Sequence, residues 1–166
     1  MPVIRQPLQA RLLDKAQDTS MSDCCCSNAP AKTRQVCPEC GSACISVGMR
    51  TLYHQVRFPE NQAITADSYF YCPSKQCAVG YFSSYGNTVP KQHLRSYSAI
   101  QKDKLCYCFD IDAEQYSSAL KANRAEPIKD FVIQRTKSGE CACEIRNPSG
   151  QCCLANFKYL EKNQSQ

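Results

Sequence analysis

The pattern of apolar and polar positions predicts a β-rich first part and a helical second part. Between residues 37 and 100, the aromatic and β-branched runs SYFYC and AVGYF stand on either side of a cysteine pair, which is typical of a two-stranded hairpin. Ile45 and Val47 continue from an earlier cysteine pair as another short strand, and TLYHQV fits either a helical turn or a strand. Turn-forming residues separate these segments, so we expect a small β module.

Beyond residue 105 the apolar positions follow helical spacing. Asp112 is placed to cap a helix over AEQYSSALKA, and Pro127 suits the first turn of a second helix that Gly139 would close. A last helix is predicted over residues 153–162, with leucine and phenylalanine on one face. This part of the chain is therefore expected to be a helical module.

These patterns divide the sequence into a tail over residues 1–36, a β module over 37–104 and a helical module over 105–166, which makes an α+β protein. The tail lacks sustained periodicity and contains the polar stretch SNAPAKT, so we expect it to be flexible. Met21 would also make a natural start, which would leave residues 1–20 as an upstream extension.

The cysteine count changes the picture, because the 166 residues include 14 cysteines and no tryptophan. The sequence begins without the basic and apolar pattern of a secretory signal, and no apolar run approaches the roughly 20 residues of a membrane span. We therefore expect a cytoplasmic protein, in which closely spaced cysteines are metal ligands more often than disulfides.

Charge excludes one class of partner. The net charge of +5 is spread along the chain and forms no dense basic stripe with interleaved aromatic residues, so we expect no nucleic-acid partner.

The first cysteine constellation is typical of a structural zinc site. CPEC supplies Cys37 and Cys40, and CPSKQC supplies Cys72 and Cys77, with each pair beside a predicted strand. Two such turns bring four sulfurs together in the closed tetrahedral site that Zn2+ prefers. Cys44 is a spare thiol beside the first pair and could replace one ligand.

The second constellation consists of CYC before the predicted helices and CACEIRNPSGQCC after them. Two sulfurs from Cys106 and Cys108 could hold one iron of a [2Fe-2S] cluster, while the later segment supplies the other two thiolates. A second zinc is the alternative. Since the two constellations have separate ligands and separate apolar contacts, we expect loss of the first metal to leave the second module partly intact.

The four segments CPEC, YFYCPSKQCAVGYF, CYC and SGECACEIRNPSGQCC resemble the N-terminal domain of the CopZ-type copper chaperones of archaea. They resemble even more closely the bacterial iron–sulfur cluster-binding metallochaperones, over residues 22–160. The resemblance implies a zinc-ribbon-like β module, followed by a module similar to bacterioferritin-associated ferredoxin that carries a [2Fe-2S] cluster. Carried over by position, the implied zinc ligands are Cys37, Cys40, Cys72 and Cys77, and the implied cluster ligands are Cys106, Cys108, Cys143 and Cys153.

Two of these assignments have a close competitor. The family motif leaves three residues between its cysteine and NPSG, which selects Cys143 over Cys141. Cys152 is the alternative to Cys153, and adjacent side chains diverge, so only one of them easily reaches the same iron.

The resemblance implies a metallochaperone for copper or another soft metal, with a metal-transporting ATPase or a redox protein as partner. The archaeal chaperones continue into a domain with a Met-x-Cys-x-x-Cys copper loop, whereas this sequence ends at Gln166. We therefore expect Cys24, Cys25 and Cys26 to bind Cu+ transiently. No catalytic triad or phosphate loop is present, so the only reaction expected is reduction of Cu(II) by one electron from the cluster. The alternative function is a ferredoxin-like electron carrier with no copper role.

Overall fold

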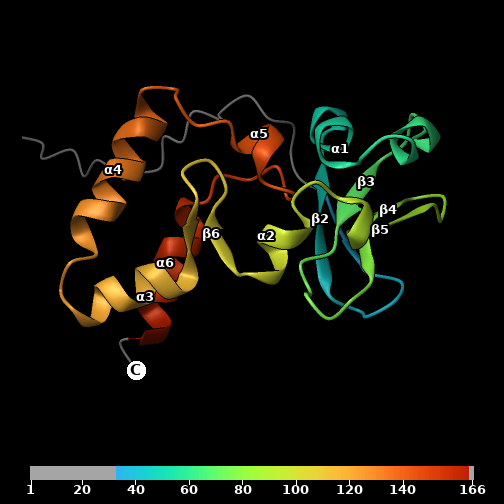
Figure 1. Cartoon of the computed structure of the whole chain (residues 1–166). Coiled ribbons are helices and arrows are strands. Elements are labelled where there is room, and N and C mark those ends of the chain that lie inside the picture. Colours follow the sequence, from blue (N-terminus) through green and yellow to red (C-terminus); the bar gives the residue numbers. More distant parts are fainter. Residues whose placement is uncertain (1–32, 165–166) are drawn as a thin grey trace, which may run out of the picture.

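The protein has a mixed α/β fold with an antiparallel sheet at one end and helices α3, α4 and α6 at the other (Figure 1). The computed structural model describes residues 33–164. Its five-stranded sheet is a meander in which neighbouring strands follow one another in the chain, all antiparallel. The strands are β1 (Arg34–Val36), β2 (Ala43–Val47), β3 (Tyr69–Tyr71), β4 (Val79–Ser83) and β5 (Thr88–Pro90).

Short helices connect these strands and lead to the second half of the chain. Helix α1 and the 3-10 helix η1 lie between β2 and β3, and η2 and α2 follow β5; their bounds are α1 (Met49–Gln55), η1 (Glu60–Ala63), η2 (Lys91–His93) and α2 (Tyr97–Gln101). The second half contains a two-stranded sheet and four helices: β6 (Lys104–Cys106), β7 (Ile111–Asp112), α3 (Ala113–Lys121), α4 (Glu126–Lys137), α5 (Cys143–Arg146) and α6 (Leu154–Gln164).

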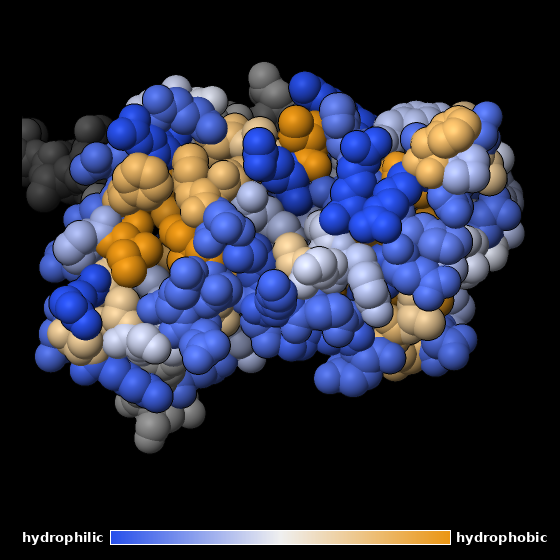
Figure 2. Space-filling model, in the orientation of Figure 1, coloured by the Kyte–Doolittle hydropathy of each residue, from blue (hydrophilic) through white to orange (hydrophobic). Residues whose placement is uncertain are grey.

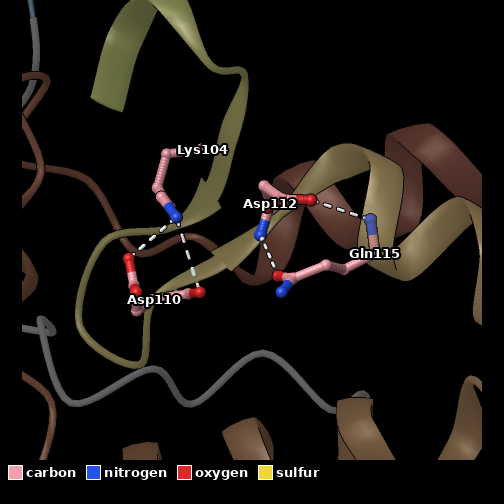
Figure 3. A network of polar contacts seen from close by, with 4 residues as sticks. All are labelled: Lys104, Asp110, Asp112 and Gln115. Atoms are coloured by element: carbon pink, nitrogen blue, oxygen red, sulfur yellow. Dashed lines mark hydrogen bonds and ion pairs between the residues drawn. The ribbon is translucent and has the colours of Figure 1, made fainter. Parts of the chain in front are cut away.

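Several elements agree with the sequence prediction. SYFYC and AVGYF form the antiparallel pair β3–β4, in which Phe70 lies opposite Phe82. Asp112 caps α3 in a reciprocal capping box, because its carboxylate accepts from the backbone N–H of Gln115 and the Gln115 side chain accepts from that of Asp112 (Figure 3). Gly139 follows α4 with a positive φ of 71°, a conformation that glycine adopts without strain.

The two faces of the five-stranded sheet have different partners because side chains alternate along a strand. Tyr69, Tyr71 and Tyr81 lie in one core with Leu52, Val56 and Leu94, beneath α1. Phe70 and Phe82 point to the other face, where their rings stack with centroids 5.5 Å apart beside buried cysteines. The alternation therefore separates a tyrosine-rich face from a cysteine-rich face.

A separate core lies among the elements after residue 104. Tyr116 of α3 and Phe157 of α6 are fully buried and meet edge to face, with ring centroids 4.7 Å apart. Beside them, Lys129 and Glu161 form an ion pair at 2.8 Å. Three cysteines also belong to this core, namely Cys106, Cys143 and Cys153. The second thiol site is thus built into a hydrophobic centre.

The structure corrects the predicted tail boundary and adds a hairpin that was not predicted. Residues 34–36, which we placed in the tail, form β1 and pair with residues 43–45 of β2. Their side chains are all exposed, so the sequence shows no alternating apolar pattern there. The strand forms because its backbone pairs with β2. No pattern in the sequence indicated how the second half begins. It begins with the short β6–β7 hairpin, closed by an ion pair of 2.7 Å between Lys104 and Asp110 (Figure 3).

The surface is largely polar in the view of Figure 2, with an apolar patch over the region of α4 and the β6–β7 hairpin. On α4, Phe131 is 43% exposed and packs edge to face on Phe109. Among the described residues, no helix is long and apolar enough to cross a membrane.

Candidate metal centres

The first thiol site contains the four cysteines that the sequence singled out. The sulfur atoms of Cys37, Cys40, Cys72 and Cys77 all lie within 4.8 Å of one another. Cys37 Sγ is 3.8 Å from Cys77 Sγ, and Cys40 Sγ is 3.6 Å from Cys72 Sγ. A tetrahedral zinc with Zn–S bonds of about 2.3 Å requires sulfurs about 3.8 Å apart. The donor set and its spacing therefore fit Zn2+.

Two backbone turns bring these sulfurs together. In the turn between β1 and β2, the N–H of Cys37 donates to the carbonyl of Ser42, and the N–H of Gly41 donates to the carbonyl of Cys37, both at 2.9 Å. The second turn begins directly after β3, where the N–H of Cys72 donates to Gly80. The site is therefore a product of the sheet, with one ligand pair at each of two neighbouring strand ends.

The four thiols differ in their exposure and acidity. Burial raises the pKa values of Cys72 and Cys77. Cys40 is exposed instead, and a hydrogen bond with the Ser42 hydroxyl, 3.3 Å away, lowers the pKa of Cys40 to about 6. A thiolate is the form that binds a metal, so Cys40 is the exposed and more readily deprotonated ligand candidate of this site.

A buried lysine holds the second cysteine turn. Lys91 is 2% exposed, and its ammonium group donates to the carbonyls of Ser74, Cys77 and Val79 at 2.8, 3.0 and 2.7 Å. Four residues separate the two cysteines of CPSKQC, and this longer loop turns its carbonyls inward, where Lys91 satisfies them. Four thiolates around Zn2+ also leave an excess of negative charge, which the lysine partly balances. No sequence pattern indicates this role.

Replacing Lys91 with methionine should therefore weaken zinc binding by about 10- to 100-fold, the range typical of residues that support metal ligands. Three carbonyls would lose their donor, and the thiolates would lose the nearby positive charge. Competition with a chromophoric chelator measures the affinity. Lys75→Met is the matched control, because Lys75 lies in the same loop but forms an exposed ion pair with Asp103. Equal affinities for the two variants would contradict the role of Lys91.

Cys44 does not join the first site. Its thiol is buried and donates to the carbonyl of Ser42 at 3.2 Å, and burial raises its pKa. Its side chain therefore packs beside the four ligand candidates as part of the same apolar cluster.

The second thiol site consists of two pairs of sulfurs. Cys106 Sγ lies 3.1 Å from Cys153 Sγ, and Cys108 Sγ lies 3.6 Å from Cys143 Sγ. Within residues 33–164, the first site alone has its ligand atoms all within 4.8 Å of one another, so these four sulfurs do not form one compact tetrahedron. Cys106 also hydrogen-bonds with Cys108, and Cys143 with Cys153, so the four sulfurs form one open group. An open group of four thiolates suits a [2Fe-2S] cluster, which needs two thiolates on each iron.

The CYC spacing suggested that Cys106 and Cys108 share one iron, and this stays a prediction. The two thiols hydrogen-bond to each other, and each also has a short contact with a cysteine from the later segment. Tyr107, between them, packs its side chain against the core beneath α1, while both neighbouring sulfurs belong to the second core. Burial raises the pKa of Tyr107 to about 12.

Hydrogen bonds among the four thiols of the second site shift their pKa values in opposite directions. Those with Cys106 and Cys143 lower the pKa of Cys108 to about 3, and the one between Cys106 and Cys153 lowers the pKa of Cys153 to about 4. Donation to Cys108 raises the pKa values of Cys106 and Cys143. The backbone N–H of Ala142 also donates to Cys108 Sγ at 3.3 Å. Backbone donation to a ligand sulfur is one way in which a protein tunes a cluster.

The two competing cysteines are both near the second site and partly exposed. Cys152 forms a hydrogen bond with Cys143 and so lies at the edge of the site, while Cys141 precedes α5. The four-residue helix α5 begins at Cys143 and was not predicted, because one turn of helix leaves no periodic pattern. The three cysteines of the tail, Cys24, Cys25 and Cys26, lie outside the described residues.

Comparison with known proteins agrees with the first site and with the fold. Residues 34–95 match a family model that is named for CopZ and described as a zinc binding domain. No match is found among curated proteins. The solved structure of the Archaeoglobus fulgidus CopZ N-terminal domain is similar, with a TM-score of 0.59 and 23% sequence identity, covering 76% of this chain and 98% of that one. Residues 34–95 thus resemble a CopZ-type zinc binding domain, and the described chain shares the fold of the CopZ N-terminal domain.

Proposed function

We propose that the protein is a metallochaperone that carries a structural zinc and a [2Fe-2S] cluster and that binds and delivers Cu(I). The observation that carries the proposal is the presence of two thiol sites of different geometry in a chain with a CopZ-type zinc-binding segment. The first is a compact group of four sulfurs, and the second is a more open group of four sulfurs with two short contacts. The similarity of residues 34–95 to a zinc binding domain supports a metal-handling role.

The first site serves the fold. Its ligands are Cys37, Cys40, Cys72 and Cys77, and zinc has no redox chemistry of its own. Three of these four cysteines are buried against Phe70 and Phe82. Zinc binding therefore supplies folding free energy to a small sheet with a small core.

The second site is proposed to be the redox centre, with Cys106, Cys108, Cys143 and Cys153 as ligands. A [2Fe-2S] cluster held there would supply single electrons, enough to reduce one Cu(II) to Cu(I). The chain contributes two low-pKa thiolates, a backbone donor to Cys108 and an apolar surrounding that limits solvent access.

Copper itself is proposed to bind to Cys24, Cys25 and Cys26. Three adjacent thiols offer the soft, low-coordinate environment that Cu(I) prefers and from which it can exchange to a partner. A metal-transporting ATPase or a redox protein is the proposed recipient.

The decisive experiment starts with full-length protein purified without oxygen. We expect bound iron, sulfide and zinc, a red-brown colour, and tight binding of Cu(I) that is lost when Cys24, Cys25 and Cys26 are all changed to serine. The matched control is Cys44→Ser, a buried thiol outside both sites, which should keep full Cu(I) binding. Colourless protein would refute the cluster, and Cu(I) binding that survives the triple change would refute the tail as the copper site.

A ferredoxin-like electron carrier is the second candidate. The observation that favours it is that all four ligands of the second site come from residues 106–153, so an electron-transfer centre needs no contribution from the tail. Red-brown protein that binds no Cu(I) would support this function over copper delivery.

A further inference from the structure

Residues 143–153 carry two ligand candidates of the second site. Side chains from residues 34–101, which contain the first thiol site and are called the zinc-binding half below, hold this segment in place. Gln55, the last residue of α1, is 3% exposed, and its side-chain amide donates to the carbonyls of Ile145 and Arg146 at 2.8 and 2.9 Å. These carbonyls end helix α5 and have no acceptor role inside it. The hydroxyl of Ser96 donates to the other end of the amide at 2.6 Å and fixes its orientation.

A second contact reaches the turn that follows α5. Tyr81 of β4 is fully buried, and its hydroxyl donates to the carbonyl of Pro148 in the NPSG turn. Gly150 approaches α1 so closely that a Cβ atom there would lie 2.8 Å from Thr51 Oγ1, and its φ of 65° also favours glycine. The NPSG turn therefore packs against the zinc-binding half, where it contacts Tyr81 and Thr51.

These contacts connect directly to the first thiol site through the backbone. Tyr81 follows Gly80, whose carbonyl accepts from the N–H of the ligand candidate Cys72. Tyr81 also lies opposite Tyr71 of β3, the residue before Cys72. Helix α1 follows β2, the strand that leaves the first cysteine turn, and it packs on α5 (Figure 1).

We propose that Gln55 and Tyr81 are positioning residues for the second site, so that zinc at the first site sets the geometry of Cys143 and Cys153. The inference rests on the proposed function for the identity of the second centre. It replaces the expectation of two independent modules, because buried side chains of one half hydrogen-bond to the segment that carries Cys143 and Cys153. Loss of the hydrogen bond from Gln55 or from Tyr81 removes one of the contacts that hold residues 143–153, but it removes no thiol.

The test uses full-length protein loaded with zinc but free of iron, so it needs no cluster. Amide hydrogen exchange over residues 143–153 and alkylation rates of Cys143 and Cys153 report how firmly the segment is held. Tyr81→Phe and Gln55→Leu should each raise both rates about fivefold or more, while the zinc content stays at the wild-type level. Zinc removal should raise them further.

The matched control is Tyr71→Phe. Tyr71 is a buried tyrosine on the next strand, with its ring centroid 5.7 Å from that of Tyr81, but no hydrogen bond found among residues 33–164 joins it to the NPSG turn. The Tyr71→Phe variant should show the wild-type rates of amide exchange and of cysteine alkylation. Unchanged rates in both Tyr81→Phe and Gln55→Leu would overturn the inference. If the wild-type protein never binds iron, the proposed cluster fails, but these rates still decide the positioning role.

Discussion

Changing Cys72 or Cys37 to serine should remove one zinc per chain and make residues 34–101 sensitive to proteases. Structural zinc contributes roughly 10–16 kcal/mol of apparent binding free energy in small domains, far more than a sheet of this size could lose and remain folded. Both cysteines are almost fully buried, so an unliganded serine hydroxyl there adds an uncompensated polar group to the loss of metal. Zinc analysis and limited proteolysis measure the two effects.

Cys44→Ser is the matched control for this prediction, because Cys44 is equally buried and lies in the same apolar cluster but outside the group of four sulfurs. It should keep its zinc and its resistance to proteases. Full zinc in both Cys37→Ser and Cys72→Ser would show that the first site is not the zinc site.

The second large effect concerns the cluster ligands. Cys106→Ser, Cys108→Ser, Cys143→Ser and Cys153→Ser should each abolish or strongly bleach the charge-transfer absorption of anaerobically purified protein. Each change removes one sulfur from a pair that lies 3.1 or 3.6 Å apart, and a cluster with three thiolates is far less stable than one with four. Visible spectra, normalised to protein and zinc content, provide the measurement.

Cys141→Ala and Cys152→Ala test the choice among neighbouring cysteines. Both should keep the absorption, since neither sulfur belongs to the two short pairs. A colourless Cys141→Ala variant together with a coloured Cys143→Ala variant would show that the ligand choice is wrong while the cluster remains. Full colour in all six variants would exclude a cluster at this site.

The sequence predicted the parts of the fold that local chemistry determines. A cysteine pair separated by two residues makes a metal turn by itself, and Asp112 with Gln115 forms a helix start from four residues. The hairpin of β3 and β4 was predictable because its aromatic residues alternate between two buried faces.

The remainder depended on contacts between distant residues. Strand β1 exists because its backbone pairs with β2, although all three of its side chains are exposed. The charged side chain of Lys91 is indistinguishable in sequence from a surface lysine, yet it is among the most buried residues. Gln55 likewise gives no signal, because its partners are carbonyls 90 and 91 residues further along the chain.

The anchoring of Tyr107 has a consequence for anyone who would transplant the second site into another protein. The side chain between the two cysteines of CYC is partly buried and packs against the core of the other half, so the tripeptide also connects the halves. A graft of residues 105–164 alone would remove the core against which the Tyr107 ring packs. A transplant that keeps this contact therefore also carries α1 and the tyrosine-bearing strands.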